Sequence, residues 1–354
     1  MSADIADRFF LVWTTPPASF QPRYFRAVQS IRRWHPHAAI NVLSNTLPSD
    51  FFGELAVTVQ RFSLEELTRN SPAAVWYSHR HIWNRSSYFS NHEADFLRLL
   101  TLWRQGGVYV DTDVIFLRPL RLPRGCVAAV GIESGVSSLA RPAAHVDDEP
   151  STYRPAAQPS HQPGSSAILC NAVMAFEAGA PLLARALDTF VHEYVPYTPG
   201  ASMIELYARG EWGAMGPLLL TRLMMMPPDS SRSSLASSSA TSSSSSTTSS
   251  TSSSSASTTA TTTSSSSSTS ACILEREALY PLEPAATPSH FGPWDESRDG
   301  PLWGRLHARS VTVHFWNGLT RDTPLHCGSL IHRLLEEHSG CTLPGAKCNP
   351  LPCT

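Results

Sequence analysis

The chain has 354 residues, 42% of them hydrophobic, so it is long and apolar enough to bury a sizeable core. Its formal net charge is -2, and no basic stripe or cationic amphipathic helix is present that would bind nucleic acid or a membrane surface. No run of about eighteen apolar residues occurs, so the sequence predicts no membrane-spanning helix.

The first third of the chain alternates between strand and helix patterns. Residues 9–14, 39–43 and 57–62 are short β-rich runs, and each predicts a strand. Pro22 suits the first position of a helix, and apolar side chains follow it at helical spacing up to residue 34. Strands that alternate with helices predict an α/β domain with a mixed, mostly parallel sheet flanked by helices.

A largely buried helix is predicted before residue 106. Residues 90–93 read SNHE and fit a capping box, while two glycines at positions 106 and 107 provide a stop. Most positions between them are apolar. Asp95 and Arg98 are three residues apart and share the remaining polar face.

Asp111 and Asp113 follow the next predicted strand, at residues 108–110. Residues 106–113 read GGVYVDTD. Residues two apart on a strand point to one face, so both carboxylates could approach one ion. Hard oxygen ligands at a strand end suit Mn²⁺ or Mg²⁺ bound together with phosphate oxygens. An isolated Asp-x-Asp pattern is more often a solvated turn, so the surrounding sequence decides between the two interpretations.

That surrounding sequence, residues 95–120, resembles the DXD-containing sugar-binding region of glycosyltransferase family 32, in particular its α1,4-galactosyltransferase and α1,4-N-acetylglucosaminyltransferase group. Further similar stretches follow in the family's order: FLVW at 10–13, LCNAVMAF at 169–176, WG at 212–213, GPLLLTR at 216–222, EALYP at 277–281 and VHFWN at 313–317. The resemblance implies a GT-A-like nucleotide-sugar-binding fold.

The resemblance also implies roles for individual residues around a metal ion. Asp113 would ligate Mn²⁺ (or Mg²⁺) directly, and Asp111 would contact the ribose and the metal shell. His314 and Trp316 would approach the metal and the diphosphate from the C-terminal side. A divalent ion in this place would neutralise the charge that grows on the departing diphosphate.

A second group would hold the donor. Trp13 would lie against the base, Asp95 and Arg98 would hold sugar hydroxyls, and Asn171 would touch the donor sugar. Each of these residues also has a structural interpretation. Asp95 with Arg98 could form only an ion pair, Trp13 and His314 could be core side chains, and Asn171 could cap a turn.

The implied activity is the retaining transfer of a hexose or N-acetylhexosamine from a nucleotide sugar, expected to be UDP-linked, to a hydroxyl of a glycan or glycolipid. The catalytic nucleophile is left unassigned. A haloacid-dehalogenase-like phosphatase also places Asp-x-Asp after a strand, but it needs a downstream lysine, and the chain's one lysine is Lys347. A non-catalytic nucleotide-sugar-binding protein on the same fold stays open as the alternative.

The sequence predicts one GT-A-like domain made of residues 1–229 and 271–340. Residues 230–270 are almost wholly Ser, Thr and Ala and are expected to be disordered, and residues 141–164 are expected to form a surface loop. Residues 341–354 form a cysteine-rich tail. Cys327, Cys341, Cys348 and Cys353 allow three disulfide pairings, among which the sequence does not choose.

The expected location is the Golgi lumen. Relatives of this family are commonly Golgi type II membrane proteins, and no membrane anchor is found in this chain. A single N-glycosylation sequon at residues 84–86 agrees with a secretory compartment.

Overall fold

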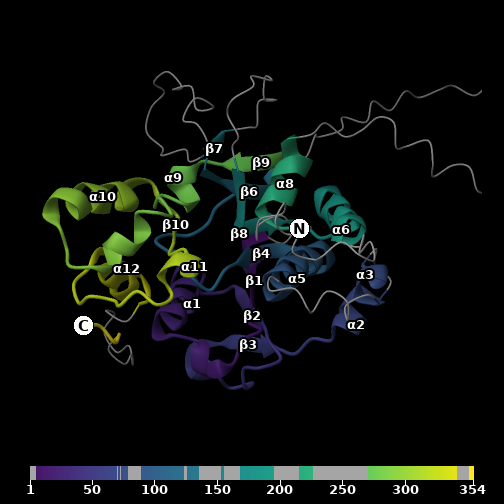
Figure 1. The fold of residues 1–354 in the computed structure, drawn as a ribbon, viewed down its shortest axis with the longest axis horizontal. Helices are drawn as coiled ribbons and strands as arrows, with labels where there is room; N and C mark the ends of the chain where they lie inside the picture. The colour runs from purple at the N-terminus through teal and green to yellow at the C-terminus, as the bar shows by residue number, and fades with distance from the viewer. Residues whose placement is uncertain are drawn as a thin grey trace, which may run out of the picture.

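The computed structural model describes residues 5–69, 71, 73–78, 89–122, 126–134, 153–154, 168–194, 215–225, 270–340 and 351–354 (Figure 1). Several sequence-based expectations concern residues outside these ranges. They are the sequon at 84–86, the Trp-Gly pair at 212–213, the Ser/Thr-rich tract up to residue 269, and the cysteines at 341 and 348.

An eight-stranded mixed sheet runs through the centre of the molecule, in the order β3-β2-β1-β4-β8-β6-β9-β7 (Figure 1). Its strands are β1 (Arg8–Val12), β2 (Ala39–Leu43), β3 (Val57–Gln60), β4 (Gly107–Val110), β6 (Cys126–Ser134), β7 (Tyr153–Arg154), β8 (Ile168–Phe176) and β9 (Ser270–Leu274). The pairs β3/β2, β2/β1, β1/β4 and β6/β9 are parallel, and the other three are antiparallel. The expected α/β class with a mixed, mostly parallel sheet is confirmed.

A second, two-stranded sheet pairs β5 (Val114–Phe116) with β10 (Thr312–His314) in antiparallel register. The chain passes from the large sheet to this small one between Val110 and Val114. The two aspartates of interest therefore lie in the short connection between the two sheets.

Helices α5 (Phe89–Gln105), α6 (Pro181–Tyr194) and α8 (Pro217–Met225) pack on one face of the large sheet. The strands supply alternate residues to this layer, as their period of two requires. Phe10 and Tyr109 point into it, whereas Phe9, Val108 and Val110 point into the opposite layer.

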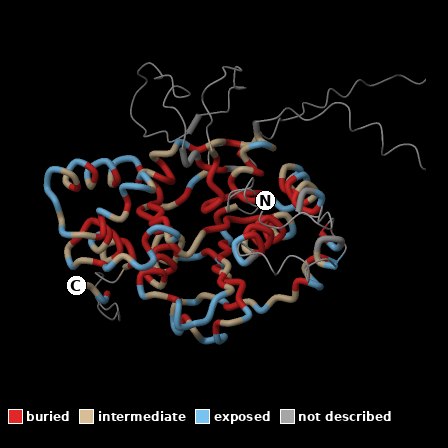
Figure 2. Tube along the Cα trace, viewed as in Figure 1, coloured by how far each residue is buried: buried red, intermediate tan, exposed pale blue. Residues whose placement is uncertain are grey.

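The opposite layer contains α1 (Pro22–Trp34) and the inner face of the small sheet. As the sequence predicts, the helix begins at Pro22 and buries Tyr24, Val28 and Ile31. Figure 2 shows the buried residues running along the central strands and along the helix faces turned toward them.

A third apolar cluster covers the outer face of the small sheet. It packs Ile115, Val313 and Phe315 against α10 (Glu296–Arg309) and α12 (Leu330–His338). These elements lie together at one end of the molecule (Figure 1). The shorter helices are α2 (Leu64–Thr68), α3 (Ala74–Ser78), α9 (Arg276–Leu279) and α11 (Asn317–Thr320), and the 3₁₀ turns are Ile5–Asp7, Pro17–Ser19, Gly53–Leu55 and Thr287–Phe291.

The two glycines after α5 are required by the backbone. Gly106 has φ 63° and Gly107 has φ 115°. A Cβ on Gly106 would lie 2.7 Å from the Ala178 nitrogen, and one on Gly107 would lie 2.7 Å from the Arg8 oxygen. Glycine alone adopts these angles without strain, so the predicted stop of α5 at this point is confirmed.

Other boundary expectations were wrong. The capping box at residues 90–93 lies inside α5, because the helix already includes Phe89. Residues 141–164 were expected to form only a surface loop, yet Tyr153–Arg154 pairs with β9 as strand β7. Side-chain signals place a helix end only to within one or two residues, and a strand of two residues is too short for a periodicity to predict.

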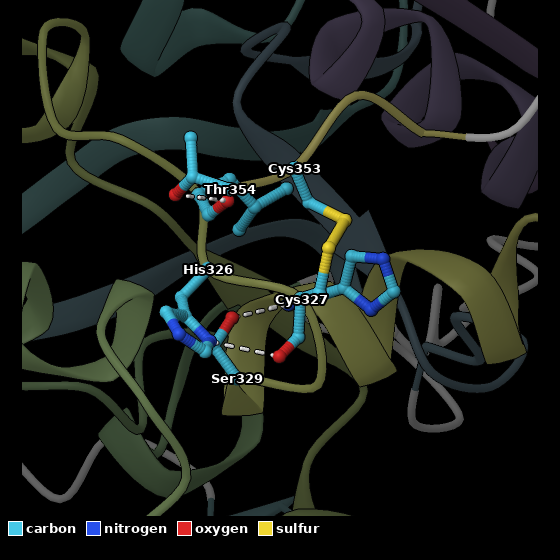
Figure 3. The surroundings of a disulfide bond; sticks show 7 residues. His326, Cys327, Ser329, Cys353 and Thr354 are labelled. Carbon is cyan, nitrogen blue, oxygen red and sulfur yellow. Dashed lines mark hydrogen bonds between the residues drawn. A yellow bond between two sulfur atoms is a disulfide. The ribbon is translucent and has the colours of Figure 1, made fainter.

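Two disulfides occur among the described cysteines. Cys126–Cys272 joins β6 to β9 and was not predicted, and Cys327–Cys353 joins the loop before α12 to the C-terminal residues. Figure 3 shows the second bond, beside which the Cys327 N–H donates to the Thr354 oxygen at 3.0 Å. Leu351 is buried in the cluster around α10 and α12. The division of the chain into one domain, an insertion and a tail stays a prediction.

None of the helices in the described ranges has the length and hydropathy required to cross a membrane.

Candidate active site

The candidate site lies where the order of the large sheet reverses. From β1 the chain continues to β2 on one side, and it later returns to place β4 on the other side. Ligands of open α/β sheets bind outside the carboxyl ends of the strands at such a switch point. Trp13 directly follows β1, and Asp111 directly follows β4, so the topology brings these two predicted residues to the same edge.

Arg98 connects three of the predicted residues. Its Nη2 lies 3.4 Å from Asp95 Oδ1 and 3.3 Å from Asp111 Oδ1. Its Nη1 donates to the Asn171 main-chain oxygen at 2.9 Å, and Asn171 Nδ2 donates to Asp95 Oδ1 at 2.8 Å. The Asp95–Arg98 ion pair of the structural interpretation therefore exists, but it is part of a larger buried network.

Asp113 is held from the C-terminal side. His314 Nε2 lies 3.2 Å from Asp113 Oδ2, and the Asn317 N–H donates to the same oxygen at 2.6 Å. The Phe315 N–H donates to the Asp113 main-chain oxygen at 2.9 Å. Strand β10 and helix α11 thus fix Asp113 although they lie about 200 residues away along the chain.

The Asp pair follows strand β4, as the sequence predicts, but it lies in a turn, so the two side chains do not share one strand face as expected. Strand β4 ends at Val110, and the Val114 N–H donates to the Asp111 oxygen at 3.2 Å across a turn. Asp111 accordingly faces Arg98, and Asp113 faces His314. The turn still gathers the side chains, since ligand atoms of Asp111, Asp113 and His314 lie within 4.8 Å of one another.

Two carboxylates and one imidazole fit a divalent ion such as Mn²⁺. Burial by itself would raise the pKa of Asp113, but His314 outweighs it and lowers that pKa, so Asp113 is a carboxylate. Burial likewise lowers the pKa of His314 while Asp113 raises it, and the net direction is upward. His314 therefore exchanges a proton for an ion when it ligates a metal, because a ligating imidazole is neutral.

The carboxyl groups on the Arg98 side behave differently. Burial raises the pKa of Asp95 to about 6, although Arg98 and Asn171 oppose it. Burial also raises the pKa of Asp111, against the effect of Arg98. The site thus holds one strongly acidic carboxyl, Asp113, beside two that ionise less readily.

The two predicted tryptophans each pack beside a tyrosine, Trp13 beside Tyr24 and Trp316 beside Tyr280. Trp13 is 9% exposed, its ring centroid lies 5.7 Å from that of Tyr24, and its Nε1 has no hydrogen-bond partner in the described part of the chain. Trp316 packs on His314 with centroids 4.1 Å apart and donates from Nε1 to the Leu282 oxygen. Both side chains are buried in the core, as the structural interpretation had it for Trp13, and Trp316 also contacts the predicted ligand His314.

A pocket of about 320 Å³ opens at Thr14, the residue that follows Trp13 in the chain. The residues after β1, β2 and β3 line it together with α3 and α5, namely Thr14, Asn45, Phe62, Ser63, Leu64, Tyr77 and Glu93. None of the predicted site residues lines this pocket, and sequence reasoning did not find it. The alignment of three parallel strand ends is the signal that could have indicated it.

Sequence reasoning also missed three residues that support the site. The Tyr109 hydroxyl donates to Asp111 Oδ1 at 2.6 Å, and the Tyr24 hydroxyl donates to Asn317 Oδ1. Gly216 lies so close that a Cβ there would be 2.5 Å from Asn171 Nδ2 and 2.7 Å from Asp95 Oδ1. Tyr109 and Gly216 stand within the motifs that carry the family resemblance, but a motif does not tell which neighbours touch.

Comparison with known families gives one match, to the glycosyltransferase sugar-binding region containing the DXD motif, over residues 22–134. An uncharacterized protein of Arabidopsis thaliana is 29% identical over 197 residues, which is 53% of this chain and 25% of that protein. Lactosylceramide 4-alpha-galactosyltransferase of Mus musculus is 27% identical over 227 residues, 60% of this chain and 50% of that protein. The chain thus spans between a quarter and a half of these relatives.

Solved structures with a similar chain path include the PaToxG glycosyltransferase, with a TM-score of 0.39 and 15% identity over 62% of this chain and 68% of that one. Another is the UDP-bound glycosyltransferase domain of the YGT toxin, with a TM-score of 0.34 and 10% identity over 53% of this chain and 62% of that one.

The matched region begins at the first residue of α1 and ends at the last residue of β6, so it contains Asp95, Arg98, Asp111 and Asp113. The expected resemblance to glycosyltransferase family 32 is confirmed: residues 22–134 match the glycosyltransferase sugar-binding region containing the DXD motif, and Asp111 and Asp113 lie within the matched residues.

Proposed function

We propose that the chain is a metal-assisted, retaining glycosyltransferase. It moves a hexose or N-acetylhexosamine from a nucleotide sugar, UDP-linked, to a hydroxyl of a glycan or glycolipid. The observation that carries the proposal is that Arg98 contacts both Asp111 of the candidate metal site and Asp95 of a buried polar pair. The Asp111–Asp113–His314 cluster is a candidate metal site, and the buried Asp95–Asn171 pair offers hydrogen-bonding groups to a sugar.

Asp113, Asp111 and His314 are the residues that would hold Mn²⁺ or Mg²⁺. The bound ion supplies positive charge that neutralises the departing diphosphate. Arg98 contributes a permanent cation next to Asp111, fixed by its bonds to Asp95 and the Asn171 oxygen. Because these groups are already oriented and buried, little reorganisation is needed when charge develops on the leaving group.

The donor is proposed to lie across the switch point. Asp95, Arg98 and Asn171 would hold sugar hydroxyls, and Asp111 would contact the ribose. The base would lie against Trp13 and in the pocket beside it, where Thr14 and Asn45 offer polar atoms next to the apolar Phe62. Trp316, packed on His314, would border the diphosphate.

The α1,4 linkage and a glycolipid or glycan acceptor are proposed from the lactosylceramide 4-alpha-galactosyltransferases, of which this chain covers half or less. The Golgi lumen is proposed as the location on the same ground. The two disulfides support a secretory compartment, because such bonds persist in oxidising environments.

The test is nucleotide release from a panel of UDP-galactose, UDP-N-acetylglucosamine, UDP-glucose and GDP-mannose, with Mn²⁺ and lactosyl acceptors. We expect turnover with one UDP-sugar, loss of turnover with EDTA, and a fall of at least about a hundredfold in kcat/KM for Asp113→Ala. Asp188→Ala is the matched control, because Asp188 is half exposed on α6 and outside the site. Full activity of Asp113→Ala would refute the metal assignment.

The alternative is a non-catalytic nucleotide-sugar-binding protein on the same fold. Calorimetry separates the two: such a protein would bind a UDP-sugar with Mn²⁺ and yet release no UDP with or without acceptor. For an active chain, the anomeric configuration of the first product, read by NMR, tests retention. An inverted product would overturn the proposed stereochemistry and leave the transferase assignment in place.

A further inference from the structure

A second cluster of metal-ligating side chains lies at the other end of the described structure. His307 stands in the last turn of α10, and Glu337 and His338 end α12. His307 Nε2 lies 3.2 Å from Glu337 Oε1, and His338 Nε2 lies 3.7 Å from the same oxygen. Ligand atoms of the three residues all lie within 4.8 Å of one another.

The hydrogen bond of His307 fixes the orientation of its ring. Its Nδ1 lies 2.9 Å from the Trp303 main-chain oxygen, which can only accept, so Nδ1 carries the proton. A neutral His307 then presents the lone pair of Nε2 to the Glu337 carboxylate. Two acceptors at 3.2 Å need a cation between them, either a proton or a metal ion. An Nδ1–H bond to a carbonyl is also the usual outer contact of a metal-bound histidine.

The burial of His338 and its lack of hydrogen-bond partners are an independent sign of a ligand at this place. The residue is 4% exposed, and both of its ring nitrogens lack a hydrogen-bond partner in the described ranges. Buried polar atoms are normally partnered. Burial, with His307, Arg33 and Arg118 nearby, lowers the pKa of His338 to about 3, so the ring is neutral. Neutral imidazole is the form that binds a metal ion.

We propose that His307, Glu337 and His338 form a second cation site, suited to Zn²⁺. Two imidazoles and one carboxylate are a recurrent zinc ligand set, with water as the fourth ligand. Neighbouring ligands of a tetrahedral zinc ion lie about 3.3 Å apart, as its bond lengths imply. The separations of Glu337 Oε1 from His307 Nε2 and His338 Nε2, 3.2 and 3.7 Å, are close to that value.

The helix ends favour a cation that joins α10 and α12, whereas the guanidinium groups of Arg33 and Arg118 oppose added positive charge, as their effect on the pKa of His338 shows. The ligands come from the C-terminal turns of α10 and α12, and the carboxyl ends of helices favour positive charge. Arg33 and Arg118 also lie there, but their guanidinium groups donate to the main-chain oxygens of Glu337 and His307. They leave the three side-chain ligand atoms available. The Glu337 side chain is 44% exposed, which gives an ion access from solvent.

The experiment uses the full chain carrying Asp113→Asn, which weakens the candidate catalytic metal site by replacing one anionic ligand with a neutral amide of the same size. Zn²⁺ is titrated by calorimetry, and Co²⁺ is added as a spectroscopic probe of ligand geometry. We expect one Zn²⁺ per chain, a melting temperature that rises with the Zn²⁺ concentration, and the visible bands of tetrahedral Co²⁺ without a thiolate charge-transfer band.

Adding Glu337→Gln or His307→Asn should weaken Zn²⁺ binding at least tenfold and remove the Co²⁺ bands. Both side chains are partly exposed, so these variants should fold, whereas His338 is too buried for a safe substitution. Glu336→Gln is the control, because Glu336 pairs with Arg26 and lies outside the cluster. Unchanged Zn²⁺ affinity in Glu337→Gln, or a Co²⁺ spectrum with thiolate bands, would overturn the proposal. A test of transferase activity would not be affected by either result.

Discussion

Gly216 lies against the two side chains that hold each other on the Arg98 side of the site. Alanine there would place its Cβ 2.5 Å from Asn171 Nδ2 and 2.7 Å from Asp95 Oδ1. We expect Gly216→Ala to push Asp95 and Asn171 apart and to lower kcat/KM by about 10- to 100-fold, the loss typical of a small misplacement of positioning groups. Steady-state kinetics with the active UDP-sugar would measure it.

Gly304→Ala is the control, because it makes the same substitution on α10, where no atom lies within 4 Å of the introduced Cβ. It should keep full activity and gain slightly in stability, since alanine favours a helix over glycine. Wild-type kinetics in Gly216→Ala would show that the Asp95–Asn171 contact is not needed in its present geometry.

At this scale the sequence predicted which residues gather but not how they contact one another. Asp95 and Arg98 were placed on one helix face by their spacing, and the structure adds that Arg98 also reaches Asp111. The Asn317 N–H bond to Asp113 depends on Trp316 at φ 54°, a left-handed conformation that no local pattern indicates for a tryptophan.

The N-terminal turn of α10 is organised by Asp299, which is fully buried. Its carboxylate accepts from His290 Nδ1 at 2.8 Å, from Arg298 Nε at 2.9 Å and from the Asp295 N–H at 3.0 Å. Burial alone would raise the pKa of Asp299, but these bonds outweigh it and lower the pKa to about 2. We expect Asp299→Asn to cost about 1–3 kcal/mol of unfolding free energy, because buried donors lose their acceptor.

Asp299 also makes the stability of the folded chain depend on pH in the acid range. Since the folded pKa of Asp299 lies below its unfolded value, the unfolded chain binds more protons between pH 4 and pH 2. The stability from Asp299 is complete above that window and is lost as the pH falls through it. Urea denaturation at several pH values should show a shallower loss in Asp299→Asn than in wild type, and parallel curves would contradict this. Asp188→Asn, at a half-exposed position, should follow wild type.

Helices and strands with a clear period were predictable. The ranges of β2 and α1 agree with the sequence-based expectation, because their apolar periods end at clear signals. Strands β5, β7 and β9 were not predicted as strands. Strand β5 pairs with β10, β9 pairs with β6, and β7 pairs with β9, each across a long stretch of sequence. A run of two to five residues does not indicate such a distant partner.

The two disulfides found among the described residues close loops of very different length. Cys126 and Cys272 are 146 residues apart, and Cys327 and Cys353 are 26 apart. The chain-entropy relation gives about 5 kcal/mol for the longer loop and about 3.5 kcal/mol for the shorter. We therefore expect Cys126→Ala/Cys272→Ala to lower the free energy of unfolding more than Cys327→Ala/Cys353→Ala, measured by urea denaturation without reductant. An equal or smaller loss for the first pair would contradict the loop-length argument.

The turn that carries Asp111 and Asp113 is also where the chain leaves the large sheet for the small one, and its acidic residues are completed by His314 and Asn317 about 200 positions later. Contacts of such separation form late in folding, because a long loop has to close before they are gained. A chain that has formed its sheet without docking β10 would therefore have half a metal site. Affinity for the proposed metal ion should then serve as a reporter of completed folding, and the proposed turnover of donor should be absent from a nascent chain until its last hundred residues have joined the fold.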